Sequence, residues 1–176
     1  MDTDIHVRRL EANDNRASFR CGNIELDRFF QRYAGQNQFR HHIGTTYVAV
    51  LDQQITGFVT VSMGELTAEN ITRALRKRLP AYPLPVLRIA RLAVDLDFQK
   101  QGIGKLLLKA MLELALNLRD QVGCTGVVVD AKPDSVEFYG RLGFSRIEAV
   151  TGMLDDRPEP APMWLPIQLI AKAAQK

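Results

Sequence analysis

One junction in the middle of the chain restricts the possible folds more than any other stretch. Residues 87–94 are largely apolar and have the length of a buried strand, and the segment 99–105, QKQGIGK, follows shortly after. Beyond it, apolar residues recur at intervals of three and four without a break, which predicts a long helix with one face in the core. These residues are Ile103, Leu106, Leu107, Ala110, Met111, Leu114, Ala115 and Leu118. The sequence therefore predicts a strand, a glycine-containing turn and a helix in succession, as in proteins of the α/β type.

The first third of the chain predicts a helix followed by a β-hairpin. Asn23 is placed to cap the helix at its start. The apolar stripe of this helix consists of Leu26, Phe29, Phe30 and Tyr33. β-Branched and aromatic residues fill 45–52 and 55–63, which indicates two antiparallel strands joined by residues 52–54.

The remaining elements complete a mixed arrangement. We expect helices and strands in alternation in the second half, which indicates a central sheet with helices packed on it. The expected helices cover 68–80 and 134–144, and the expected strands cover 85–94, 126–131, 144–150 and 163–170. The predicted fold class is α/β (α+β), with a mixed central β-sheet flanked by helices. We expect a single domain of residues 1–176, with a core of about 5–170.

The composition is typical of a soluble protein with one core. A chain of 176 residues, of which 46% are hydrophobic, can bury enough surface to fold without a metal or a disulfide. No apolar run approaches the roughly 20 residues of a membrane span, and the acidic start has no signal-peptide core, so we expect a cytoplasmic protein. Cys21 and Cys124 lack metal-ligand spacing; we expect them to stay reduced, and we expect no metal site. The net charge of +3 permits a nucleic-acid partner without requiring one.

The glycine-containing segment has the features of an anion site at a helix start. The first N–H groups of a helix have no partner within it, and Gly102 and Gly104 would let the main chain come close to a phosphate. A tight turn that needs glycine only for its backbone conformation is the alternative. The dinucleotide fingerprint requires a third glycine where Leu107 stands, and the P-loop requires a wider glycine spacing, so neither NAD nor ATP is supported.

Two motifs in this order resemble those of the GNAT family of N-acetyltransferases. Residues 91–112, RLAVDLDFQKQGIGKLLLKAML, resemble its cofactor motif, with Gln99, Gly102 and Gly104 in register. Residues 130–144, DAKPDSVEFYGRLGF, resemble its second signature, in which a Phe-Tyr pair precedes Gly-Phe. The resemblance implies a GNAT fold and acetyl-CoA as the cofactor.

The resemblance also implies which residues would hold that cofactor. Backbone groups of Leu92, Ala93 and Val94 would pair with its pantetheine arm. Its pyrophosphate would lie on the glycine segment, which comprises Gln99, Lys100, Gln101, Gly102, Ile103, Gly104 and Lys105. The physical expectation of an anion at this helix start agrees with that assignment.

Acetyl transfer from a thioester also requires an acid for the departing thiolate. A tyrosine has an ordinary pKa of about 10 and is protonated at neutral pH, and Tyr139 matches the tyrosine that the family uses in this role. Taken alone, a tyrosine directly after a phenylalanine on a helix is more often a half-buried packing residue, and only the motif favours the catalytic role. A general base is harder to identify, because no pair of the only histidines, His6, His41 and His42, has metal-ligand spacing within a helix. Glu65 is where a base lies in some relatives, but a glutamate at a strand end is usually a solvated residue.

Within the family, the first half of the chain most resembles bacterial toxin acetyltransferases of type II toxin–antitoxin systems. That resemblance implies acetylation of the α-amine of aminoacyl-tRNA, a block of translation, neutralisation by a ribbon-helix-helix antitoxin, and dimer formation. Basic residues offer a tRNA surface consisting of Arg73, Arg76, Lys77, Arg78 and Arg91.

Two other functions stay open on the sequence alone. The enzyme could acetylate a small-molecule amine or a protein N-terminus, or the chain could be a non-catalytic acyl-CoA-binding module in which Tyr139 is structural. The basic segment 73–78 could likewise be an ordinary solvated helix face.

Overall fold

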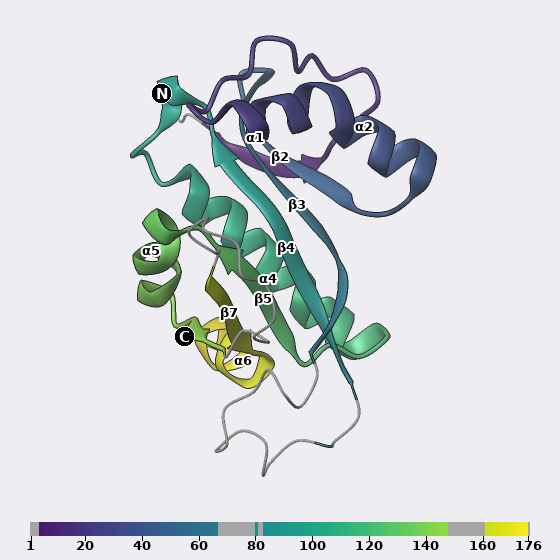
Figure 1. Ribbon diagram of the computed structural model, residues 1–176, viewed down its shortest axis with the longest axis vertical. Coiled ribbons are helices and arrows are strands. Elements are labelled where there is room, and N and C mark those ends of the chain that lie inside the picture. Colours follow the sequence, from purple (N-terminus) through teal and green to yellow (C-terminus); the bar gives the residue numbers. More distant parts are fainter. Residues whose placement is uncertain (1–3, 67–79, 81–82, 148–160, 176) are drawn as a thin grey trace, which may run out of the picture. The chain divides into compact units, whose positions relative to one another are not determined.

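The computed structural model describes residues 4–66, 80, 83–147 and 161–175. Over these residues, seven strands form one sheet in the order β1-β2-β3-β4-β5-β7-β6, and helices are packed on it (Figure 1). The predicted mixed sheet flanked by helices is therefore confirmed. By its contacts the chain divides into two compact units, residues 1–62 with 89–113 and residues 63–88 with 114–176. The single domain expected over residues 1–176 stays a prediction.

The first unit begins with β1 (His6–Arg9) and a helical run from Ile24 to His41. The run consists of α1 (Ile24–Arg28), a π-helical segment η1 (Phe29–Tyr33), α2 (Ala34–Gln36) and a second π-helical segment η2 (Asn37–His41). Asn23 caps it as predicted, because its side chain accepts a hydrogen bond from the Leu26 N–H at 3.1 Å.

The predicted apolar stripe of this helix is wrong at Tyr33. Phe29 and Phe30 are buried, but Tyr33 is 47% exposed and Ala34 takes the buried position. The π-helical turn is the reason: the Ala34 N–H bonds to the carbonyl of Phe29, five residues back, and the wider turn rotates Tyr33 out of the core.

The β-hairpin is confirmed, with β2 (Thr45–Leu51) antiparallel to β3 (Gln54–Leu66) and β1 antiparallel to β2. Asp52 and Gln53 both have positive φ, 48° and 65°, which is the geometry of a tight two-residue hairpin turn. On one face of β3, Phe58 stacks on Phe30 of the helical run with ring centroids 4.5 Å apart. This aromatic cluster is the core between the helical run and the hairpin.

The strand–turn–helix unit is also confirmed. Strand β4 covers Leu84–Val94, a short 3-10 helix η4 covers Leu96–Phe98, and α4 covers Ile103–Gln121. Among the residues predicted for its apolar face, Ile103, Leu107, Met111 and Ala115 are buried. No described helix is both long and apolar enough to cross a membrane.

The second unit holds the other predicted motif. It contains β5 (Gly126–Ala131), a 3-10 helix η5 (Pro133–Ser135), α5 (Val136–Arg141), β6 (Ser145–Arg146), β7 (Ala161–Pro166) and α6 (Ile167–Ala174). Strand β7 pairs antiparallel with both β5 and β6. Cys21 and Cys124 are free thiols, as predicted.

The strand predicted over 163–170 is wrong in its second half. The strand ends at Pro166, which has no N–H for a further ladder hydrogen bond, and α6 begins at the next residue. Ile167 and Ile170 are the buried residues of α6, and their spacing of three is that of a helix. Within the described part of the predicted strand 144–150, only Ser145 and Arg146 form strand β6. The helix expected over 68–80 lies outside the described residues, apart from Pro80.

Candidate active site

The end of β4 lies close to β3 and to the start of α4. Ala93 is buried, and Leu92 and Val94 are half-buried. A methyl group added to Gly57 of β3 would lie 3.0 Å from the carbonyl oxygen of Ala93 and 3.1 Å from a side-chain carbon of Ile103. Glycine at this position therefore lets the predicted cofactor strand and the helix after it pack directly on β3.

A buried carboxylate holds the chain where it leaves β4. Asp95 is only 7% exposed, and its two oxygens accept hydrogen bonds from the N–H groups of Arg20 at 3.2 Å and Asp97 at 3.0 Å. Its own N–H donates to the carbonyl of Thr56 at 2.8 Å. The Leu96 N–H in turn donates to the carbonyl of Arg20 at 2.8 Å. Asp95 thus joins the segment around residue 20 to the start of the glycine loop.

Gln99 makes a second connection between the same two segments. Its amide nitrogen donates to the carbonyls of Cys21 and Val94, each at 3.0 Å. The Cys21 N–H donates to the buried carboxylate of Asp27 at 2.8 Å. Both amide protons of Gln99 are used within the protein, so its side chain fastens the loop to residue 21. Asp95 and the segment 19–21 were not among the predicted site residues. The one signal for Asp95 in the sequence is that an acidic residue comes directly after a buried strand.

The glycine turn presents main-chain donors at the start of α4. Gly102 has a φ of +84°, and a methyl group added there would meet nothing within 4 Å. The first hydrogen bond of the helix is from the Leu106 N–H to the Gly102 carbonyl, so the N–H groups of residues 103–105 have no acceptor within the helix. Lys100 and Lys105 are exposed beside them. Open space, unpaired donors and positive charge fit a pyrophosphate at this point of the chain.

Tyr139 lies on α5 in the second unit. It is 5% exposed, and its ring packs edge-on against Phe138 and Phe144, with centroids 5.1 and 5.4 Å away. Burial raises the pKa of Tyr139 to about 12, so its hydroxyl keeps its proton at neutral pH. That hydroxyl makes no hydrogen bond with any residue that the structure describes. Just past the helix, the Phe144 N–H closes the turn by donating to the Tyr139 carbonyl at 3.1 Å, with Gly143 at a φ of +98°.

The side chains considered as general bases are all exposed. His6 lies on β1, His41 and His42 end the helical run, and Glu65 lies near the end of β3. None of the four makes a side-chain hydrogen bond or an ion pair within the described part of the chain. Over that same part, no group of three or more His, Cys, Asp or Glu residues could hold a metal ion.

The predicted tRNA surface is only partly described. Arg73, Arg76, Lys77 and Arg78 lie outside the described residues. Arg91 lies on β4 with its guanidinium carbon 3.8 Å from the centre of the Phe29 ring, and burial lowers its pKa.

Comparison with known proteins gives the family. Residues 16–153 match the family model described as an acetyltransferase (GNAT) domain, and this span includes the end of β4, the glycine turn and Tyr139. The chain belongs to the GNAT acetyltransferase family. It is an acetyl-CoA-dependent N-acetyltransferase, as the two motifs predicted.

Individual relatives lie within the same family. A protein of Mycobacterium tuberculosis (strain ATCC 25618 / H37Rv) named as a tRNA-acetylating toxin is 28% identical over 138 residues, which cover 78% of this chain and 82% of the relative. The structure of AtaT complexed with acetyl-methionyl-tRNAfMet has a TM-score of 0.84 at 21% identity and covers 97% of this chain and 99% of that one. A structure of an AtaT variant bound to the C-terminus of the antitoxin AtaR and acetyl-CoA has a TM-score of 0.77 at 21% identity, with coverage of 98% and 99%. At these identities the two structures establish a common fold.

Proposed function

We propose that this GNAT enzyme transfers the acetyl group of acetyl-CoA to the α-amine of an aminoacyl-tRNA and thereby blocks translation as a toxin. The observation that carries the proposal is that a relative 28% identical to this GNAT chain is named as a tRNA-acetylating toxin. The solved structure of AtaT, whose fold is the same, is a complex with acetyl-methionyl-tRNAfMet.

The donor site in this proposal is the end of β4 and the turn after it. The main chain of Leu92, Ala93 and Val94 pairs with the pantetheine arm, and the unpaired N–H groups of Ile103, Gly104 and Lys105 bind the pyrophosphate. The side chains of Lys100, Gln101 and Lys105 and the open backbone of Gly102 complete the anion site. Gln99 acts by holding this loop against Cys21.

Tyr139 acts as the acid of the reaction. Acetyl-CoA supplies a thioester, and the bond from the amine nitrogen to the acetyl carbon forms as the carbon–sulfur bond breaks. Tyr139 is protonated at neutral pH, as is any tyrosine with the ordinary pKa of about 10, and burial raises its pKa further, to about 12. It gives this proton to the departing sulfur. The same low-polarity surroundings raise the proton affinity of a thiolate beside it, which keeps the transfer feasible. A main-chain N–H of residues 92–94 polarises the thioester carbonyl.

The acceptor is an α-amine because a more basic amine would require a general base, and the candidate bases are poorly placed for that role. An α-amine has a pKa of about 7.7–8.0 and is partly neutral at physiological pH, whereas a lysine amine at about 10.4 requires a base. Within the described residues the candidate bases His6, His41, His42 and Glu65 are exposed and unpaired. The amine therefore loses its proton to solvent.

The proposal includes the partners of such a toxin. The enzyme acts in the cytoplasm, forms a dimer, and is neutralised by a ribbon-helix-helix antitoxin. AtaT bound to the C-terminus of its antitoxin AtaR supports the antitoxin partner by analogy of fold.

The test is to supply acetyl-CoA labelled in its acetyl group together with either charged tRNA or a panel of small amines and peptides. We expect label on the aminoacyl group of tRNA, released by mild alkaline hydrolysis of the ester. Label found only on small amines or peptide N-termini would replace the toxin proposal by one of those activities. A Tyr139→Phe variant that binds acetyl-CoA normally is the control, and its rate should fall by about 10²–10⁴-fold if Tyr139 is the acid. A parent protein that binds acetyl-CoA and labels no acceptor would indicate the non-catalytic module.

A further inference from the structure

The helical run of residues 24–41 has a solvent face rich in arginine. Its inner face buries Phe29, Phe30 and Ala34 against the hairpin. Three exposed arginines, Arg28, Arg32 and Arg40, which we call the arginine row, follow a four-residue spacing in which exposed Gln36 occupies the remaining position. A spacing of four lies between the turn of an α-helix and the wider turn of a π-helix, so residues at this spacing stay on one face of the run.

The charges of this row are not neutralised within the described part of the protein. There, ion pairs form at Arg8, Arg88, Arg119 and Arg141, each with a nearby carboxylate. None involves Arg28, Arg32 or Arg40. Exposed guanidinium groups without carboxylate partners are available to an external anion, and guanidinium binds phosphate through paired N–H groups.

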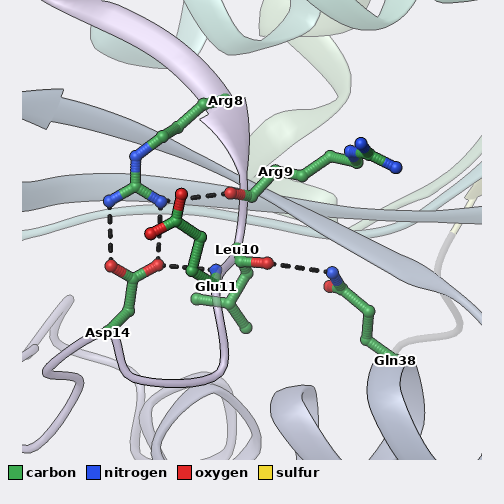
Figure 2. A network of polar contacts seen from close by, with 6 residues as sticks. All are labelled: Arg8, Arg9, Leu10, Glu11, Asp14 and Gln38. Carbon is green, nitrogen blue, oxygen red and sulfur yellow. Dashed lines mark hydrogen bonds and ion pairs between the residues drawn. The ribbon is translucent and has the colours of Figure 1, made fainter.

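Exposed aromatic rings accompany the arginine row. Tyr33 and Phe39 are 47% and 43% exposed, and both belong to the π-helical segments of the run. Phe39 and Gln38 also line a hollow of about 540 Å³ together with Arg8 and Arg9 of β1. Figure 2 shows Arg8 held by Asp14 through two hydrogen bonds of 2.8 Å, while Arg9 extends away from this pair. The hollow therefore adds one cation without a carboxylate partner among the described residues, beside an exposed ring.

We infer that the arginine row, with Tyr33, Phe39 and Arg9, is an RNA-binding surface that holds the phosphate backbone of the acceptor. Unneutralised arginines recognise phosphates, and exposed aromatic rings stack on unpaired bases, so the combination fits RNA. The inference rests on the proposed function and assigns RNA contacts to residues 28–40, a set that differs from the tRNA surface predicted from the sequence. A second copy of the chain is the less suitable occupant, because a two-fold contact would bring the two arginine rows against each other.

The test measures binding of deacylated tRNA as a function of salt. The variant Arg28→Gln/Arg32→Gln/Arg40→Gln removes three phosphate contacts, each worth about 0.7–0.9 in the slope of log affinity against log salt, so the slope should fall by about 2 to 2.7. If the curves converge near 1 M salt, affinity at 0.1 M falls by about a hundredfold or more. The matched control is Lys109→Gln/Arg119→Gln/Lys172→Gln, which removes the same charge from exposed positions on α4 and α6. Its slope should stay close to that of the parent.

A second variant separates stacking from charge. Tyr33→Leu/Phe39→Leu keeps every charge and removes two stacking rings, so affinity for single-stranded 3′ ends should fall by about thirtyfold or more while the salt slope stays constant. The surface inference is overturned if the arginine variant has the slope of the control, or if polyglutamate displaces the RNA as well as tRNA does. It is also overturned if the arginine variant changes only the oligomeric state in sedimentation.

Separate readouts distinguish this inference from the proposed function. If the parent acetylates aminoacyl-tRNA and the arginine variant does so at the parental KM for tRNA, the surface is wrong and the function stands. If the parent labels no aminoacyl-tRNA but the arginine variant still loses affinity and salt slope for RNA, the surface stands and the function is wrong. Thermal unfolding and acetyl-CoA binding of both variants should match the parent, because all five side chains are exposed.

Discussion

Replacing Asp95 by alanine should loosen the connection between the first segment of the chain and the cofactor loop. The carboxylate is 7% exposed and accepts the N–H groups of Arg20 and Asp97. A buried N–H left without an acceptor costs about 1–3 kcal/mol, and both groups here are partly reachable by water, which places each near the lower limit. Relief of the buried charge offsets part of this loss. The expected decrease in the free energy of unfolding is therefore about 2 kcal/mol.

The measurement is urea unfolding of Asp95→Ala, with Asp97→Ala as the matched control. Asp97 is adjacent and exposed, and its carboxylate makes no hydrogen bond within the described chain, so its removal should change stability by less than about 0.5 kcal/mol. Asp95→Asn keeps one acceptor oxygen and should fall between alanine and the parent. In steady-state assays Asp95→Ala should raise the KM for acetyl-CoA more than it lowers kcat, because the loop and not the reacting atoms is displaced. Equal stability of the Asp95→Ala and Asp97→Ala variants would refute the reasoning.

Three further predictions follow from burial and close packing. Gly57→Ala places a methyl group 3.0 Å from the Ala93 carbonyl oxygen, so it should lower the free energy of unfolding by about 1–3 kcal/mol and weaken acetyl-CoA binding. A melting temperature of the variant at or above that of the parent would contradict this prediction. The pKa of Tyr139 is raised to about 12, so below pH 10 the residue is protonated in both states. Above pH 10 the unfolded chain ionises first, and stability should fall by up to about 1.4 kcal/mol per pH unit until about pH 12. Urea titrations of Tyr139→Phe should lack this loss of stability between pH 10 and pH 12. The same pH dependence in the variant and the parent would contradict the prediction. Burial raises the pKa of Cys21 from 9.0 to about 11, so in a Cys124→Ala background its alkylation by iodoacetamide at pH 8 should be about a hundredfold slower than in the urea-unfolded chain; equal rates would show an exposed thiolate.

Where sequence prediction failed, the cause lies in interactions that its periodicity does not encode. Tyr33 fits an apolar stripe of an α-helix, but the π-helical turn at residues 29–33 moves it to the surface. The apolar residues that follow β7 have the composition of a continued strand. Pro166 interrupts the hydrogen-bond ladder, and Ile167 and Ile170 lie on the buried face of helix α6. In the first case the conformation that buries Ala34 in place of Tyr33 prevails, and in the second Pro166, which lacks an N–H, ends the strand.

The sequence by itself determined the features that depend on neighbours along the chain. The glycine turn between β4 and α4, the long amphipathic helix and the Phe138-Tyr139 pair before Gly143 are encoded within short windows. They were sufficient to predict the fold class and, through the family resemblance, the cofactor, whereas the role of Tyr139 as the acid stays a prediction. Only the tertiary structure decided that Asp95 bonds to Arg20, 75 residues away, and that Gln99 bonds to Cys21, 78 residues away. It also decided which arginines lack a carboxylate partner among the residues that the structure describes. Hydrogen bonds and ion pairs between distant residues depend on how the strands pair and the helices pack, so they exist only once the chain has folded.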